Sequence, residues 1–425
     1  MNKETRMKSC KTLVVMVMMA FLITPCATAT GLDDLNIHGF VSQGFLYSTK
    51  DMNFLAKDSE NGTFDFNEMA VNFSVSPMEN LRMGMQLNAF DLGDIGNDEV
   101  EVDWAFGDYS ISDYLGVQAG IMKIPFGLYN EVRKVDMVRT SILLPSSVYP
   151  EWFRETFARI KGVGLYGTLP GDISYQAMYG DIHIATDGGL TDSLESLLGD
   201  LGMDTYNTDV NYAYAGKLQW DSPFGLKLGA SLYVMDGLEL DMNNTIDLPA
   251  VVTGGLAGLT SSLKGRLHFE PLKIHVFSAE YLRDRLTLAA EYCEYDLDFM
   301  VDISTTLDPA LVTAMQIPLQ VGDKTTMQGY YGSIAYRLLD QLEIGTYYSE
   351  MYYDKSDHGG REFQQKYGNP KFDAWLKDIC LSARYDFSSN WCAKIEAHIM
   401  DGTFLTYNAE ARDWELYAAK VTYSF

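Results

Sequence analysis

Apolar and polar residues alternate in short segments along most of the chain. In the last segment, Tyr417, Ala419, Val421, Tyr423 and Phe425 are apolar or aromatic, while most residues between them are polar. A period of two places successive side chains on opposite faces of a β-strand. One face then suits lipid and the other suits water, which is typical of a strand that crosses a membrane. The same alternation recurs over residues 81–88, 217–220, 226–232, 378–387 and 391–398.

Sixteen such strands are predicted, and the connections between them alternate between tight and long without exception. Seven connections are tight, such as 77–80 and 388–390, and the other eight are long. Closed membrane barrels show this pattern, because their periplasmic turns are short and their external loops are long. Closure is required because an open sheet edge in hydrocarbon would leave N–H and C=O groups unpaired. The strands are predicted to begin near Leu35, Phe64, Leu81, Val100, Leu115, Lys161, Asp172, Asp209, Gly225, Gly265, Arg285, Thr326, Leu342, Ala374, Trp391 and Ala411.

The predicted fold class is therefore all-β: a closed antiparallel transmembrane barrel of about sixteen strands with both termini in the periplasm. An aromatic girdle is expected near the tight turns. Its predicted members are Tyr109, Tyr114, Trp220, Tyr385, Phe387, Trp391 and Phe425.

The first 29 residues have the pattern of a signal peptide. Four basic residues precede an apolar run from Leu13 to Ile23, and Ala27-Thr28-Ala29 follows. The run is too short for a spanning helix, which needs ~20 apolar residues. We therefore expect a signal peptide over 1–29 and a barrel pore domain over 30–425. A lipid anchor on Cys26 is the alternative, and Pro25 directly before it fits a lipid-attachment motif poorly.

The chain is strongly acidic, with 32 Lys and Arg against 58 Asp and Glu and a formal net charge of −26. Loss of the predicted signal peptide, with four basic residues and one acid, changes this charge to −29. Such a chain repels nucleic acid and anionic surfaces. Nucleic-acid partners are therefore excluded.

The cysteines point to neither a cofactor nor a disulfide. The three that follow the signal peptide are Cys293, Cys380 and Cys392, and they form no haem or paired metal motif. The predicted pairing places Cys380 opposite His398 and Cys392 opposite Asp386. The two sulfurs are then about 20 Å apart, which is too far for a bond. No cofactor and no metal are expected. Three acidic residues could hold Ca²⁺, although a solvated acidic loop is the commoner state; they are Asp91, Asp94 and Asp98.

Two short motifs resemble those of a known family. The C-terminal Val421-Thr-Tyr-Ser-Phe425 is similar to the strand signal that outer-membrane proteins present to the barrel assembly machinery. Gly120-Ile-Met-Lys-Ile-Pro-Phe-Gly127 is similar to the exit of the fifth strand in phosphate-selective and related porins. With sixteen strands and a long third external loop, the chain resembles the Gram-negative outer-membrane porin superfamily. It departs from the phosphate-selective type in having no N-terminal coiled coil and no dense arginine ladder.

The resemblance implies an outer-membrane location with lipid and lipopolysaccharide around the barrel, assembly by the barrel machinery, and a homotrimer. It also implies that the third loop folds into the barrel and narrows it.

The predicted third loop runs from Ile124 to Lys161 and is the longest connection. A helical turn is expected to begin at Pro150, because apolar residues then recur at helical spacing through Ile160. The alternative is a surface lid with an amphipathic turn. The charged residues expected to line the constriction are Glu131, Arg133, Lys134, Asp136, Arg139, Glu151, Arg154, Glu155 and Arg159.

A second group of charges is expected on the barrel wall. Arg337 should lie opposite Glu343 and gain a cross-strand partner, whereas Arg384 should lie opposite Lys394, a like-charge pair that solvent must screen. Together with the basic third loop, this wall predicts weak anion preference or near neutrality despite the net charge. The expected wall residues are Arg82, Lys217, Lys227, Arg337, Glu343, Arg384 and Lys394.

A porin that lets small hydrophilic solutes and ions diffuse passively across the outer membrane is the function predicted. A channel selective for anions or oligosaccharides is the alternative within that class. Two other classes are a structural or adhesive barrel and an outer-membrane hydrolase. No catalytic residue is predicted, because no G-x-S-x-G motif occurs and the histidines are scattered over six segments.

Overall fold

The structure is a computed structural model of the 425-residue chain, and it describes residues 35–50, 55, 59–93, 95–186, 188–198, 201–247, 260–406 and 411–425. The predicted signal peptide at 1–29 lies outside the described residues. So does Asp94 of the acidic group, whereas β7 (Ile173–Asp181) is described in full.

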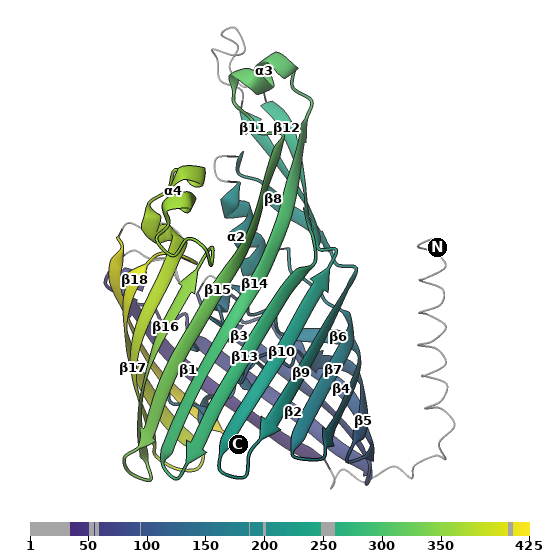
Figure 1. The fold of residues 1–425 in the computed structure, drawn as a ribbon, viewed down its shortest axis with the longest axis vertical. Helices are drawn as coiled ribbons and strands as arrows, with labels where there is room; N and C mark the ends of the chain where they lie inside the picture. Colours follow the sequence, from purple (N-terminus) through teal and green to yellow (C-terminus); the bar gives the residue numbers. More distant parts are fainter. Residues whose placement is uncertain are drawn as a thin grey trace.

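Sixteen antiparallel strands form a closed barrel (Figure 1). Each pairs with the next barrel strand along the chain, and β1 pairs with β19 to close the ring. The prediction of a closed sixteen-stranded antiparallel barrel is confirmed. The barrel strands are β1 (Asn36–Ser48), β2 (Asn67–Met78), β3 (Leu81–Asp91), β4 (Glu101–Ser112), β5 (Leu115–Lys123), β6 (Arg159–Leu169), β7, β9 (Tyr212–Asp221), β10 (Leu226–Asp236), β13 (Leu272–Arg283), β14 (Leu286–Thr305), β15 (Gln320–Arg337), β16 (Leu342–Tyr352), β17 (Trp375–Asp386), β18 (Trp391–Gly402) and β19 (Asp413–Ser424).

Three further strands extend the sheet beyond one rim of the barrel. They are β8 (Asp204–Asp209), β11 (Glu239–Asp247) and β12 (Thr260–Phe269), and β12 pairs with the outer half of β14. Figure 1 shows them projecting from the end that carries the long connections. The prediction of a barrel strand from Gly265 is therefore wrong at its start. Gly265 lies in β12, and the tenth barrel strand begins at Leu272.

The helical elements lie in the long connections. They are α2 (Gly189–Leu197), α3 (Pro309–Ala314), α4 (Arg361–Tyr367), and the 3₁₀ turns η2 (Ser59–Asn61), η3 (Asn130–Val132), η4 (Asp136–Val138), η5 (Glu151–Phe153) and η7 (Lys371–Ala374). Within the described residues, none of the helices is long and apolar enough to cross a membrane.

The tight turns and both described chain ends lie at the same end of the barrel (Figure 1). Asn36 at the start of β1 pairs with Ser74 near the β2–β3 turn, and the Phe425 amide donates to the Gly39 carbonyl at 2.9 Å. An even number of strands has this consequence.

The outer face of the barrel is apolar and carries aromatic residues near the tight turns. Tyr114, Phe387 and Phe425 of the predicted girdle are 59%, 60% and 49% exposed, so they face away from the barrel interior. In the outer part of β14 the apolar side chains no longer lie on the outer face. Tyr295 and Phe299 point inward there, whereas the acidic Asp298 and Asp302 do not. That part of the strand therefore suits water on its outer side and encloses an apolar core.

Candidate pore and its third loop

The connection between β5 and β6, residues 124–158 and here called loop 3, folds into the barrel. Ile124, Val148 and Tyr149 are fully buried, and the loop contacts inward-facing side chains from β2 round to β19. The prediction that the third loop folds into the lumen is confirmed, and the surface-lid alternative is wrong.

Gly127 is the last residue of the Gly120–Gly127 motif, and both its backbone angle and its surroundings favour glycine. Its φ of 56° lies in the left-handed region, which disfavours other residues. A Cβ at this position would also lie 2.3 Å from the Tyr149 hydroxyl and 2.9 Å from a Glu291 carboxylate oxygen. Its amide instead donates to the Ser231 hydroxyl at 3.0 Å. The absence of a side chain thus lets the chain leave β5 and turn against the wall.

Glu291 on β14 is the main polar anchor of loop 3. Its carboxylate, 3% exposed, accepts hydrogen bonds from the Leu128 amide at 2.8 Å and the Tyr149 hydroxyl at 2.5 Å, both in the loop. Two wall hydroxyls complete the set, Ser278 at 2.5 Å and Tyr331 at 2.8 Å. Within the described part of the chain no cation pairs with Glu291, so these four donors alone compensate its burial.

A second anchor lies across the lumen on β18. The two carboxylate oxygens of Glu396 accept from the amides of Ile142 and Leu143 at 2.6 and 3.0 Å. Behind Glu396, His398 lies 3.0 Å from it and 3.0 Å from Asp378, and all three are buried. Cys380 lies opposite His398, as predicted, and the three described cysteines are free thiols.

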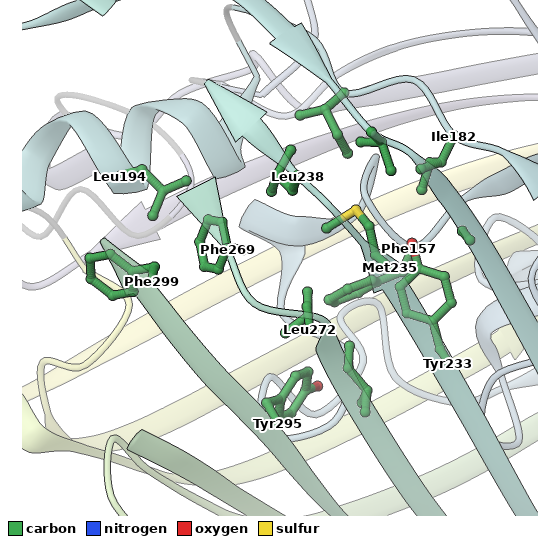
Figure 2. Close-up of a cluster of buried hydrophobic side chains, with 14 of the residues drawn as sticks. Phe157, Ile182, Leu194, Tyr233, Met235, Leu238, Phe269, Leu272, Tyr295 and Phe299 are labelled. Atoms are coloured by element: carbon green, nitrogen blue, oxygen red, sulfur yellow. The ribbon is translucent and has the colours of Figure 1, made fainter. Parts of the chain in front are cut away.

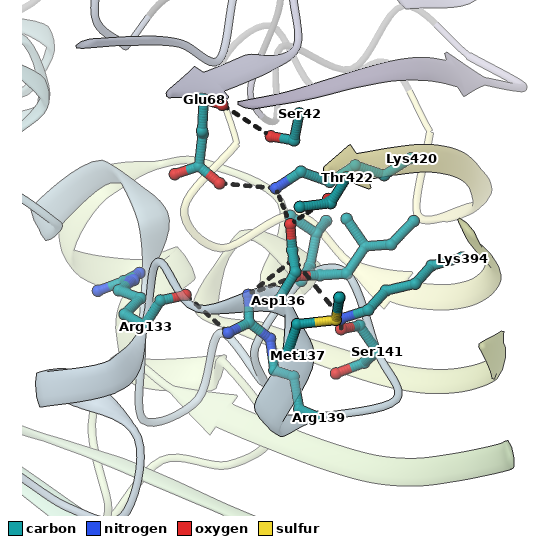
Figure 3. Close-up of polar contacts among 12 residues, drawn as sticks. Ser42, Glu68, Arg133, Asp136, Met137, Arg139, Ser141, Lys394, Lys420 and Thr422 are labelled. Atoms are coloured by element: carbon teal, nitrogen blue, oxygen red, sulfur yellow. Dashed lines mark hydrogen bonds and ion pairs between the residues drawn. The ribbon is translucent and has the colours of Figure 1, made fainter. Parts of the chain in front are cut away.

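Asp136 in loop 3 binds a row of basic residues on neighbouring strands (Figure 3). Its carboxylate lies 3.5 Å from the Lys394 ammonium and 3.0 Å from that of Lys420, and it accepts from the Thr422 hydroxyl at 2.8 Å. Arg384, Lys394 and Lys420 occupy neighbouring register positions on three adjacent strands. This row of three cations was not predicted from the sequence.

The expectation that solvent screens Arg384 from Lys394 is wrong. Lys394 is 2% exposed and is neutralised by Asp136, while Arg384 binds Asp386 at 2.7 Å. Asp136 of loop 3 therefore neutralises the positive charge that solvent was expected to screen. Burial by itself would raise the pKa of Asp136, but Lys420, Lys394 and Arg139 outweigh it and hold the pKa below its ordinary value.

Most other charged residues of loop 3 are also paired. Arg133 binds Glu151 at 3.0 Å, and Lys134 binds Asp103 on β4 at 2.8 Å. All four side chains are buried. The remaining pairs are Arg154 with Glu68 and Glu151, Glu131 with Lys217, and Arg159, the first residue of β6, with Glu101. Glu155 is half-buried.

The helical turn at Pro150 is shorter than predicted. Pro150 precedes the 3₁₀ turn η5, and one further turn is closed by the bond from the Phe157 amide to the Phe153 carbonyl. Ile160, which was expected to continue the helix, lies in β6 instead. Its neighbour Lys161 pairs with Ile121 on β5. Strand pairing overrides the local helical pattern here.

A polar cavity of about 420 Å³ separates loop 3 from the wall formed by β10 and β13 to β17. Two cations, Arg139 and Lys227, and two anions, Glu280 and Glu343, line it. Lys227 binds Glu280 at 2.9 Å, and the predicted pair of Glu343 with Arg337 is present at 3.0 Å. Of the predicted site residues, Arg139, Lys227 and Glu343 line this cavity. Arg82 is exposed on β3 near a tight turn.

Three residues that matter for loop 3 were not among the predicted site residues: Glu291, Glu396 and Lys420. Their inward positions follow from the period of two, so the strand pattern was a usable signal. Their partners in the loop were not predictable, because the path of a long loop carries no such period.

Comparisons with known proteins match the chain in sequence to a distant relative and in fold to solved structures. No family model matches the chain. A protein of Aquifex aeolicus (strain VF5), described as uncharacterized, is 24% identical over 293 residues, which cover 66% of this chain and 57% of that relative. The chain thus spans little more than half the length of that relative.

Solved structures of outer-membrane channels superpose on almost the whole chain. Salmonella typhi OmpF in complex with daunomycin has a TM-score of 0.56 at 12% identity, covering 93% of this chain and 99% of that one. This chain has the fold of the Gram-negative porins. The outer-membrane channel DcaP of Acinetobacter baumannii gives 0.55 at 10% identity, with 92% and 97% covered. An anion-selective porin from Comamonas acidovorans gives 0.53 at 12% identity, with 92% and 99% covered. At these identities the likeness concerns the porin fold alone.

Proposed function

We propose that the protein is an outer-membrane porin that lets small hydrophilic solutes and ions diffuse passively. The observation that carries the proposal is the polar cavity between loop 3 and the wall, inside a closed barrel whose outer face is apolar. Water and small polar solutes are favoured where charged and hydroxyl groups line a passage. The tight-turn end would face the periplasm, as in bacterial barrels generally.

The balance of charge around this cavity favours weak ion selectivity. Arg139 and Lys227 are matched by Glu280 and Glu343, while Arg133 and Lys134 are held in buried pairs. Charges that face the narrow water-filled space act at short range, whereas charges on the external connections act through screening water. A passage near neutrality is therefore proposed over one that selects anions or oligosaccharides.

A hydrolase function is the less favoured alternative. His398 with Asp378 and Cys380 is the group that most resembles a nucleophile and base, and it lies beneath the Ile142–Leu143 segment of loop 3. All three side chains are at most 4% exposed, so a substrate has no access to them. We propose that this group supports Glu396 in positioning loop 3.

Purified protein added to a planar lipid bilayer should produce stepwise conductance increments, because each inserted barrel adds one aqueous path. The reversal potential in a tenfold salt gradient should lie close to zero. The control is a sample unfolded in denaturant before addition. Folded protein that inserts into vesicles yet gives no steps would contradict the pore function and favour an adhesive barrel.

We also propose a homotrimer, in which the face formed by β1 and β17 to β19 is the contact. A shallow hollow on this outer face contains Ala383, Ala397 and Ala419, flanked by Phe45 and Ile395. Alternating small and large side chains let another apolar surface approach closely.

Replacing Ala397 by Trp should convert the trimer to monomer, because the larger side chain fills the hollow. Light scattering in mild detergent measures the mass. The matched control is Ala177→Trp on β7, an exposed alanine in a strand that does not border the hollow. A wild-type protein that is monomeric throughout would refute the trimer, and equal disruption by both variants would refute the assigned face.

A further inference from the structure

The external side of loop 3 carries a second cavity whose chemistry is opposite to that of the polar one. Its volume is about 210 Å³, and its lining comes from loop 3, α2, β12 to β15 and the long connection after β18. Figure 2 shows Phe157, Phe269 and Tyr295, from three separate elements, gathered in this region. Among the described residues that line it, none is charged.

Three of the four hydroxyl groups in this lining are engaged within the chain. Tyr295 donates to the Val148 carbonyl at 2.9 Å, Thr406 donates to the Thr403 carbonyl at 2.5 Å, and Tyr353 donates to Asp323. A charged or strongly polar molecule would lose more hydrogen bonds to water here than so few polar groups could replace. An apolar molecule would instead remove carbon surface from water at about 25 cal/mol per Å².

The aromatic rings present both faces and edges to the cavity. The ring centroids of Phe269 and Phe299 are 5.5 Å apart at an interplanar angle of 45°, and those of Phe157 and Tyr295 are 6.2 Å apart at 37°. Offset and tilted arrangements of this kind are the ones in which aromatic rings attract each other. A flat ring system is therefore the shape best matched to the site.

We propose that this cavity binds an uncharged aromatic molecule of one or two fused rings, taken up from the external side. An apolar cavity of ~150 Å³ holds benzene, so the larger volume here accommodates somewhat more. The site lies apart from the polar cavity, since the two linings have no described residue in common.

Binding can be measured with 1-naphthol as the probe, by calorimetry on full-length protein held in amphipol rather than detergent micelles. We expect saturable binding of one molecule per chain. The anionic 2-naphthoate, of similar size, should bind at least about tenfold more weakly, because its carboxylate finds no partner.

A variant that fills the cavity separates specific binding from partitioning. Leu238→Trp, with Leu194→Trp as a second single variant on α2, should lower affinity for 1-naphthol about tenfold or more. The matched control is Leu288→Trp, on the same wall but on the outer face of β14, where affinity should not change. Wild-type affinity in both filled variants, or no saturable binding to the wild type, would overturn the proposal. Electrophoretic mobility before and after heating shows that each variant is folded, and single-channel conductance of the same samples tests the pore separately.

Discussion

Glu291→Leu should release loop 3 from the wall and widen the pore. The substitution removes the shared acceptor of four donors, two of them in the loop. Each buried donor left unpaired costs about 1–3 kcal/mol, so we expect the folded state to lose at least about 3 kcal/mol. Loop 3 is the part that can detach while the barrel hydrogen bonds remain, and single-channel conductance should rise about twofold or more.

Urea unfolding in lipid vesicles and bilayer recordings measure the two effects. Glu291→Gln keeps one acceptor oxygen and should be less damaging. Glu294→Gln is the matched control, because this carboxylate three residues away lies on the other face of β14 and pairs with the half-exposed Lys355. Should Glu291→Leu unfold and conduct like the wild type, the carboxylate does not hold the loop.

Asp136→Asn should have an effect of similar size at the opposite wall. It leaves the Lys394 ammonium, 1% exposed, without the carboxylate that faces it and leaves Lys420 with Glu68 alone. Breaking a buried ion pair by removing one partner costs about 3–5 kcal/mol. The freed positive charge should also move the reversal potential toward anion selectivity.

A double substitution distinguishes this mechanism from general damage. Asp136→Asn combined with Lys394→Gln removes both charges and should recover at least about half of the lost stability, since no unpaired ion remains. Asp340→Asn is the control, because its ion pair with Arg285 is exposed and contributes at most about 1 kcal/mol. No recovery in the double variant would show that the Asp136–Lys394 pair is not the source of the effect.

The depressed pKa of Asp136 sets the expected pH range of this contact. The stabilisation is complete above the unfolded-state pKa of about 3.9 and is lost only as the pH falls through the lower folded-state value. Conductance recorded at pH 5 should therefore match that at pH 7, and a rise at pH 5 would contradict this assignment.

The barrel itself was predictable from the sequence because each strand signals its own two faces. The apolar Leu381 and the charged Arg384 indicate, from their own polarity, the lipid side and the lumen side of their strand. Tight turns then fix the register between strands, as the predicted pair of Arg337 with Glu343 shows. In a transmembrane barrel, hydrocarbon imposes this local rule on the part of each strand that it contacts.

The contacts inside the barrel were decided by tertiary structure. Loop 3 has no fixed period, and the partners of its charges are distant in the sequence: Asp136 accepts a hydrogen bond from Thr422, 286 residues away. Once the loop enters the lumen, a buried charge must meet an opposite charge or several hydrogen-bond donors, so Asp136 lies against Lys394 and the expected solvent screening disappears. Sequence determines which side chains face inward, whereas only packing of the whole chain determines which of them remain in contact with water.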